Sequence, residues 1–185
     1  QNVGESVVQK GVVMLPSEAI FSLSASTDVE SPDVTEKVVR YAVSEFDFTF
    51  ASPRLSMYPR LSVVVPFRGR VEHIRACVMN LSAQVYGDFE IILSEESEKP
   101  AELPSFPGVR KIHSEGGPLF NKARAINAGV QAARSRIVVI HDVDILVPDV
   151  YLSEVDVVMS ESGSGACNIL RNVIYLDRTT TDRVI

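Results

Sequence analysis

Two aspartates, Asp142 and Asp144, stand one residue apart shortly after an apolar run at residues 137–140. The run is short and β-branched, which is typical of a buried strand. Because successive strand residues point to opposite faces, we expect both carboxylates on one side and Val143 on the other, with His141 packing or hydrogen bonding behind the sheet. Neighbouring carboxylates repel each other, and a divalent cation is the usual partner that offsets this. A plain strand end whose aspartates cap the next turn is the alternative.

Basic side chains occur in two places that could lie near this acidic pair. Arg68 and Arg70 follow an apolar run at residues 61–66, and Lys122 and Arg124 open a segment with helical spacing. Cations do not suit the N-terminus of a helix, but an anion bound there would be favoured by the cations and by the backbone N–H groups. Arginine and lysine are common phosphate ligands. A solvated loop and an ordinary exposed helix face are the alternatives.

A second acidic group follows the apolar run at residues 89–93. The residues Ser94, Glu95, Glu96 and Ser97 predict an acidic turn, whose carboxylates could bind ribose hydroxyls. A plain solvated turn is again the alternative. The sequence contains no Gly-x-x-x-x-Gly-Lys-Ser/Thr motif, which argues against a P-loop nucleotide site.

The elements that must position these residues alternate between strand and helix from residue 61 onward. Strands are predicted at residues 61–66, 89–93, 109–112 and 137–140, and amphipathic helices at residues 71–85 and 121–134. This order predicts an α/β domain with a mostly parallel, Rossmann-like sheet flanked by helices. Ligands of such sheets bind beyond the carboxyl ends of the strands, where all the charged groups above would meet. Two further strands are predicted at residues 155–160 and 166–170.

Residues 1–59 differ in character from the rest. Alternation at residues 20–24 and 38–50 is typical of strands with one buried face, and the segment between them is rich in Ser, Thr, Asp and Pro. We therefore expect a β-rich N-terminal arm or subdomain over residues 1–59, ending in a linker. Residues 60–185 would form the ligand-binding domain.

The composition limits the classes of function. The 185-residue chain is 45% hydrophobic with a formal net charge of −6, which suits a globular domain and argues against nucleic acid as a partner. Its two cysteines make neither a disulfide framework nor a zinc site, and no apolar run approaches the length of a membrane span. The sequence begins at Gln1 rather than Met, so we expect a processed chain or a piece of a longer one.

Three segments, in this order, resemble motifs of nucleotide-sugar glycosyltransferases of the GT-A fold. They are Val65-Pro66-Phe67-Arg68-Gly69-Arg70, Gly117-Pro118-Leu119-Phe120-Asn121-Lys122-Ala123 and Ile140-His141-Asp142-Val143-Asp144. The similarity is strongest to the β-1,4-galactosyltransferase type, whose motifs read Val-Pro-Phe-Arg-Asn-Arg, Phe-Asn-Arg-Ala and His-Asp-Val-Asp, with the family 2 transferases as neighbours. It covers residues 61–148 and extends more weakly to about residue 177.

The resemblance implies a donor site for a UDP-sugar. The nucleotide-sugar would be bound by Pro66, Phe67, Arg68, Arg70, Glu95, Glu96, Phe120, Asn121, Lys122, Asp142 and Val143. Asp144, together with Asp142, would coordinate Mn²⁺ or Mg²⁺, and the metal would neutralise the departing diphosphate. The family has Asp-Asp where this chain has Glu95 and Glu96. It has Arg where this chain has Lys122, which supplies charge but not a bidentate fork.

The resemblance also implies an acceptor-binding half that this sequence does not show. The family continues into Gly-Trp-Gly and Glu-Asp-Asp-type segments with the catalytic base and often a metal-binding His. This chain has no Trp and no His after His141. We therefore expect a donor-binding half that is truncated relative to the family, with no catalytic residue assigned. The remaining chain or a protein partner would supply the acceptor site.

Two functions stay open on the sequence alone. One is a metal-dependent glycosyltransferase, inverting in type, that moves a sugar from a UDP-sugar to a hydroxyl acceptor. The other is a catalytically silent GT-A-like domain that serves as a binding or structural module in a larger assembly.

Overall fold

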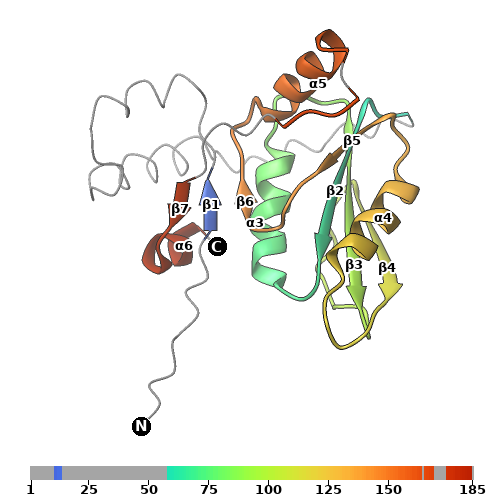
Figure 1. The fold of residues 1–185 in the computed structure, drawn as a ribbon. Coiled ribbons are helices and arrows are strands. Elements are labelled where there is room, and N and C mark those ends of the chain that lie inside the picture. The colour runs from blue at the N-terminus through green and yellow to red at the C-terminus, as the bar shows by residue number, and fades with distance from the viewer. Residues whose placement is uncertain (1–10, 14–57, 164, 169–173, 185) are drawn as a thin grey trace.

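The computed structural model describes residues 11–13, 58–163, 165–168 and 174–184 (Figure 1). Its main sheet has four strands in the order β4-β3-β2-β5. They are Leu61–Phe67 (β2), Phe89–Ser97 (β3), Val109–Glu115 (β4) and Ile137–Ile140 (β5). Every neighbouring pair in this sheet is parallel. The predicted α/β class, a parallel sheet flanked by helices, is therefore confirmed.

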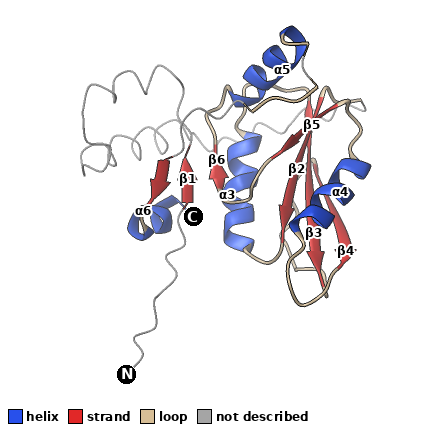
Figure 2. Cartoon of the chain, viewed as in Figure 1, coloured by secondary structure: helices blue, strands red, loops and turns tan. Residues whose placement is uncertain are grey.

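Helices cover both faces of the sheet (Figure 2). The side chains of β2 alternate, so Val63 and Val65 pack in one core with helix α3, Val71–Ser82. Val64 points to the opposite face, where it lies against helix α4, Lys122–Ala132. This alternation also decides which helix each polar residue at the strand ends faces.

The two helices end earlier than the sequence pattern predicts. Helix α3 ends at Ser82, and Val85, which was expected on its packing face, is 66% exposed. Helix α4 begins one residue later and ends two residues earlier than the predicted range of 121–134. Ends of helices are the part of an element that a periodic pattern defines least well.

The predicted acidic turn after β3 is wrong. Strand β3 continues to Ser97 because it pairs residue by residue with β4, as far as the pair Ser97–Glu115. Strand β4 is accordingly longer than the predicted range of 109–112. Glu95 and Glu96 are therefore strand residues, and their side chains are held by the sheet rather than by a loop.

Residues 155–160 form part of a helix rather than the predicted strand. Helix α5 covers Tyr151–Glu161 and buries Tyr151, Leu152 and Val155. Buried residues one and four positions apart lie on one face of a helix. A short apolar run in a sequence does not show whether the segment is a helix or a strand. In the other predicted strand, residues 166–168 have no strand structure, and residues 169 and 170 lie outside the described residues.

A second, smaller sheet adjoins the acidic pair in sequence. Its three strands are ordered β6-β1-β7. They are Gly11–Val13 (β1), Ile145–Leu146 (β6) and Ile174–Leu176 (β7). Helix α6, Arg178–Val184, follows β7. Strand β1 is parallel to β6 and antiparallel to β7. Residues 1–10 and 14–57 of the predicted N-terminal arm lie outside the described residues, so the β-rich arm and the division at residue 59 stay predictions. No helix in the described part of the chain is long and apolar enough to cross a membrane.

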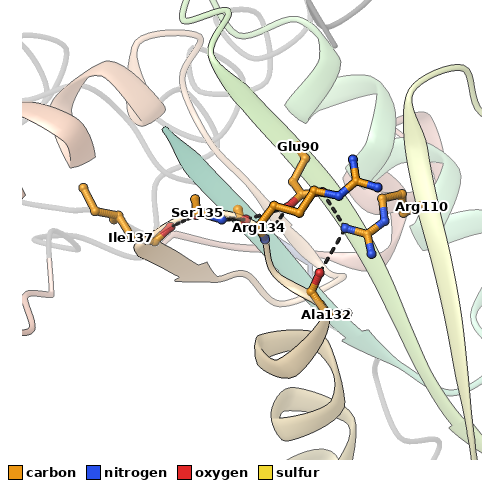
Figure 3. Close-up of polar contacts among 7 residues, drawn as sticks. Glu90, Arg110, Ala132, Arg134, Ser135 and Ile137 are labelled. Atoms are coloured by element: carbon orange, nitrogen blue, oxygen red, sulfur yellow. Dashed lines mark hydrogen bonds and ion pairs between the residues drawn. The ribbon is translucent and has the colours of Figure 1, made fainter. Parts of the chain in front are cut away.

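A buried carboxylate ties the beginning of the sheet to the end of α4 (Figure 3). Glu90 accepts hydrogen bonds from Ser62 Oγ at 2.8 Å and from Arg110 Nη1 at 2.7 Å. It also accepts one from the backbone N–H of Arg134 at 2.8 Å, and Arg110 donates to the carbonyl of Ala132. Burial alone would raise the pKa of Glu90, but these hydrogen bonds and the charge of Arg110 hold the pKa below its usual value.

Helix α4 approaches β2 most closely at Gly129. A Cβ atom on Gly129 would lie 2.2 Å from Cγ1 of Val64 and 3.3 Å from Cβ of Ser94. Val64 and Ser94 are buried strand residues at 0% exposure, so neither side chain has room to move away. The absence of a side chain at Gly129 is what lets the helix lie against the sheet.

We predict that Gly129→Ala lowers the free energy of unfolding by about 1–2 kcal/mol. Overpacking a core costs about 1–3 kcal/mol, and a contact of 2.2 Å belongs to the upper part of this range, so the gain in helix propensity of about 1 kcal/mol offsets only part of the cost. Urea unfolding followed by circular dichroism measures the change. Gly117→Ala is the matched control, because a Cβ at Gly117 has no atom within 4 Å. Equal midpoints for the two variants would contradict the close packing of α4.

Candidate functional site

A cavity of about 350 Å³ lies at the carboxyl end of β2, and its walls also include residues that follow β5. Its lining comes from three segments: the end of β2 with the loop after it, the start of α4, and the residues after β5. The lining residues are Pro66, Phe67, Arg68, Arg70, Phe120, Lys122, Asp142, Val143 and Asp144. Every one of them is among the site residues that the sequence predicts. The parallel sheet brings them together because β2 and β5 end at the same edge.

Each aspartate of the acidic pair forms an ion pair with a cationic side chain. Arg70 Nη1 lies 2.8 Å from Asp144 Oδ2, and Lys122 Nζ lies 2.6 Å from Asp142 Oδ1. The side chains of Arg70 and Lys122 thus offset the charge of the two carboxylates in this structure, a role that we expected of a divalent cation. All these side chains are partly exposed, and ion pairs of this kind contribute about 0.2–1 kcal/mol to stability.

The loop that carries Arg70 has a left-handed backbone. Gly69 has a φ of 64°, and Arg70 has a φ of 54°. A residue with a side chain adopts this region at an energetic cost, and Arg70 is the N-cap of α3 without a side-chain capping bond. Arg68 is held differently, because its Nη1 donates to the carbonyl oxygen of Gly117 at 2.7 Å. Of the two arginines, Arg70 is the one that pairs with a carboxylate within the part of the chain that the structure describes.

Asn121 fixes the start of α4. Its side-chain oxygen accepts from the backbone N–H of Arg124 at 3.0 Å. Its own backbone N–H donates to Glu96 Oε2 at 2.9 Å. The first turn of α4 contains Lys122 and no acidic residue, so a cation stands at the positive end of the helix dipole. An anion is favoured at this position, and the carboxylate of Glu96 bonds to the backbone there.

Three predicted site residues do not line this cavity. Glu95 and Glu96 are each 1% exposed, which contradicts the solvated-turn alternative. They face opposite sides of the sheet because they are consecutive strand residues. Glu96 lies on the side of α4, where its Oε2 accepts the hydrogen bond from the backbone of Asn121. Asn121 itself lines a second cavity of about 460 Å³ beside α4. A role for these three residues in donor binding stays a prediction.

Glu95 is packed on the face opposite to α4. Its Oε1 accepts from the backbone N–H of Ala101 at 2.8 Å and from Ser97 Oγ at 2.9 Å. Its Oε2 lies 3.1 Å from Lys111 Nζ, which is an ion-pair distance, but the ammonium group is not aligned for a hydrogen bond. The carboxylate is therefore charge-compensated although one oxygen lacks a donor.

His141 anchors the acidic segment behind the sheet, as predicted. It is 2% exposed, its Nε2 lies 3.1 Å from the carbonyl oxygen of Ile145, and its ring is 5.9 Å from that of Tyr151. Its backbone N–H donates to Val64, which extends the pairing of β5. Val143 is also buried in the core. Burial lowers the pKa of His141 to about 4, despite the opposing effects of its hydrogen bond and the nearby carboxylates.

The cavity can hold a divalent cation only if a bound ligand supplies further oxygen atoms to the cation. Its lining contains two carboxylates, Asp142 and Asp144. Within the described residues, no group of three or more His, Cys, Asp or Glu side chains could hold a metal ion. Mg²⁺ and Mn²⁺ prefer oxygen ligands, and Mg²⁺ is commonly held by one or two carboxylates with substrate phosphates and water. The residues present therefore fit a cation that is shared with a phosphate.

Some contacts of the site were not found from the sequence. The carbonyl of Gly117, which binds Arg68, belongs to a segment that resembles a family motif, but a backbone contact leaves no pattern in residue types. The second cavity is lined by Ser114, Asn121, Ala123, Arg124, Asn127, Ala128 and Gln131. The spacing of four between Asn127 and Gln131 on a predicted helix was the available signal.

The structure is an α/β domain whose parallel sheet carries a charged cavity at the carboxyl ends of its strands, where ligands of such sheets bind. The profile of glycosyl transferase family 2 matches residues 62–167, more than half of the sequence, and the chain belongs to this family. The resemblance found in the sequence motifs is thereby confirmed.

Comparison with solved structures gives a similar chain, the mannosyltransferase PcManGT from Pyrobaculum calidifontis in complex with GDP-Man and Mn²⁺. The identity is 22%, the TM-score is 0.43, and the match covers 76% of this chain and 43% of that chain. This chain thus spans less than half the length of that protein. Among curated proteins, no match was found.

We predict that the stability of the fold decreases as the pH falls from 6.5 to 4. In this range an unfolded His141 binds a proton, whereas the folded one, with a pKa of about 4, does not. The contribution of the neutral, buried ring is therefore complete above pH 6.5 and is lost as the pH approaches 4. Thermal unfolding from pH 7.5 to 4 measures the slope of Tm against pH. His141→Gln should flatten this slope, and an unchanged slope would contradict the assignment.

Proposed function

We propose that the cavity binds a nucleoside-diphosphate sugar, a UDP-sugar by the resemblance of its motifs, together with Mn²⁺ or Mg²⁺. The chain would be the donor-binding half of a transferase that acts on a hydroxyl acceptor. The observation that carries this proposal is the convergence of three cationic and two acidic side chains on one cavity. Membership of glycosyl transferase family 2 supports sugar transfer in general. The cavity volume of about 350 Å³ lies within the usual range of small-ligand sites, about 300–1,000 Å³.

The basic side chains would bind the diphosphate. Arg68 and Arg70 can each form two parallel hydrogen bonds to phosphate oxygens, whereas Lys122 supplies a point charge. Lys122 lies in the first turn of α4, where the backbone N–H groups and the dipole add to the attraction for an anion. Pro66 and Phe67 are buried and form a rigid wall. Phe120, 41% exposed, offers a ring face to the base or the sugar.

Asp142 and Asp144 would hold the metal ion. When bound, such an ion acts as a Lewis acid that stabilises the negative charge on the departing diphosphate. The burial of Val143 in the core fixes the short segment between the two aspartates, so both carboxylates stay directed at the cavity. Their partial exposure leaves them accessible to a ligand.

The transfer step itself needs a group that this proposal does not assign. The acceptor oxygen forms a bond to the anomeric carbon while the bond from that carbon to the diphosphate oxygen breaks. The diphosphate leaves with the electron pair, and the acceptor proton passes to a base. A single displacement of this kind inverts the anomeric configuration. Among the described residues, the carboxylates that line the cavity are the two already given to the metal, and no base is proposed.

We predict that UDP or GDP binds in a Mn²⁺-dependent manner and that Asp144→Ala weakens this binding about tenfold or more. Loss of a charge-assisted contact costs roughly 1.5–3 kcal/mol, and 1.4 kcal/mol corresponds to a factor of ten. Isothermal titration calorimetry with each nucleotide, with and without Mn²⁺, measures the affinities.

Glu98→Ala is the matched control for this experiment. Glu98 is an exposed carboxylate just beyond β3 and does not line the cavity, so its removal should leave the affinity unchanged. If neither nucleotide binds with Mn²⁺, the donor-site proposal is wrong, and the structural-module alternative is favoured.

A further inference from the structure

The groups that would bind metal and the groups that would bind phosphate are paired with each other in this structure. Asp144 accepts from Arg70 at 2.8 Å, and Asp142 lies 2.6 Å from Lys122. Only the third cation of the cavity, Arg68, contacts a neutral group, the carbonyl of Gly117. Both carboxylates and two of the three cations are therefore engaged before any ligand enters.

This pairing makes each ligand alone a poor match for the cavity. A divalent cation alone meets carboxylates whose charge is already compensated, and it is repelled by the adjacent Arg70 and Lys122. A diphosphate alone would draw those cations away and leave the like charges of Asp142 and Asp144 unopposed. When both ligands bind, the metal takes over the carboxylates and the diphosphate takes over the cations, so every charge keeps a partner.

We propose that Arg70 and Lys122 form an internal lock on the acidic pair, which makes the metal ion and the nucleoside diphosphate bind as a unit. The proposal rests on the proposed donor site. It is supported by the small ligand set, because two lining carboxylates without further protein ligands bind a metal poorly by themselves. The metal would thus enter as its complex with the nucleotide.

Two local features hold the lock in place. The left-handed backbone of Arg70, which follows the left-handed Gly69, sets its side chain toward Asp144 at the start of α3. Such a conformation in a residue with a side chain is maintained only where the surroundings fix it. Lys122 stands in a helical turn without an acidic residue, so the carboxylate of Asp142, from outside the helix, compensates its ammonium group.

The lock is weak enough to be opened by the ligands. The four side chains are between 31% and 50% exposed, so solvent screens both pairs. An ion pair of this exposure changes an equilibrium by a factor of up to about five. Charge-assisted bonds to a phosphate and to a divalent cation are stronger than this, so the exchange of partners favours the doubly bound state.

The test measures Mn²⁺ binding without nucleotide by electron paramagnetic resonance, which detects the unbound ion. We expect Arg70→Gln and Lys122→Gln each to bind Mn²⁺ alone about two- to fivefold more tightly than the unsubstituted chain. Arg68→Gln is the matched control, because it removes a cation from the same cavity that is bonded to a carbonyl. Its gain in Mn²⁺ affinity should be smaller than that of Arg70→Gln or Lys122→Gln, because it removes repulsion but frees no carboxylate. Arg75→Gln removes an exposed cation of α3 that does not line the cavity, so it should leave the affinity unchanged. Arg70→Lys, which keeps the charge, should bind Mn²⁺ more weakly than Arg70→Gln.

A second measurement determines the coupling between the two ligands. The factor by which saturating UDP or GDP tightens Mn²⁺ binding should be smaller in Arg70→Gln than in the unsubstituted chain, because the lock contributes to this factor. Two results would overturn the proposal. One is unchanged Mn²⁺ affinity in both Arg70→Gln and Lys122→Gln. The other is an equal gain in Arg68→Gln, which would show a general charge effect.

The failure of this inference is distinguishable from the failure of the donor site. If Mn²⁺-dependent nucleotide binding occurs but Mn²⁺ affinity does not respond to Arg70→Gln or Lys122→Gln, only the lock is wrong. If no nucleotide binds even with Mn²⁺, the donor site is wrong, and the lock on a nucleotide–metal complex is wrong with it.

Discussion

The carboxylates of Asp142 and Asp144 stand so close in sequence that the fold has to place positive charge beside them. Arg70 and Lys122 supply it through the contacts described above, and the first of these joins residues 74 positions apart in the chain. These ion pairs link the three segments of the cavity, which the parallel sheet brings to one edge. They also set the chemistry of the cavity, because a ligand that binds to either aspartate, to Arg70 or to Lys122 has to replace an existing partner.

The packing behind the cavity keeps this arrangement in place. Gly129 lets α4 lie close to β2, and Glu96 binds the backbone of Asn121, so the helix begins at a fixed point beside the acidic segment. On the other face, His141 and Val143 are buried and anchor the residues on either side of Asp142. The site is therefore built from rigid elements, and only the tips of its charged side chains are exposed.

The parallel sheet and the cavity lining could be predicted because both depend on local patterns and one topological rule. Alternating strand and helix patterns define the sheet, and parallel strands end together, so Arg68, Lys122 and Asp142 had to be neighbours. The ion pair between Arg70 and Asp144 could not be predicted, since it depends on the left-handed backbone of Arg70, a conformation in which glycine is the usual residue.

Two of the secondary-structure predictions made from the sequence are wrong for the same reason. The polar residues 94–97 resemble a turn, but β4 pairs along their whole length and makes them strand. Residues 155–160 alternate weakly enough to suit a strand, but the burial of Tyr151, Leu152 and Val155 against the core makes them helix. In both cases the partner element decided the structure, and a partner is not visible in a local window of sequence.

The most direct test of the account is a crystal structure of this chain grown with Mn²⁺ and the nucleoside diphosphate that it binds. The account predicts that Mn²⁺ contacts Asp142 and Asp144 and that the side chains of Arg70 and Lys122 have moved from these carboxylates to the phosphates. Intact pairs between Arg70 and Asp144 and between Lys122 and Asp142, with the nucleotide or the metal bound elsewhere, would contradict it.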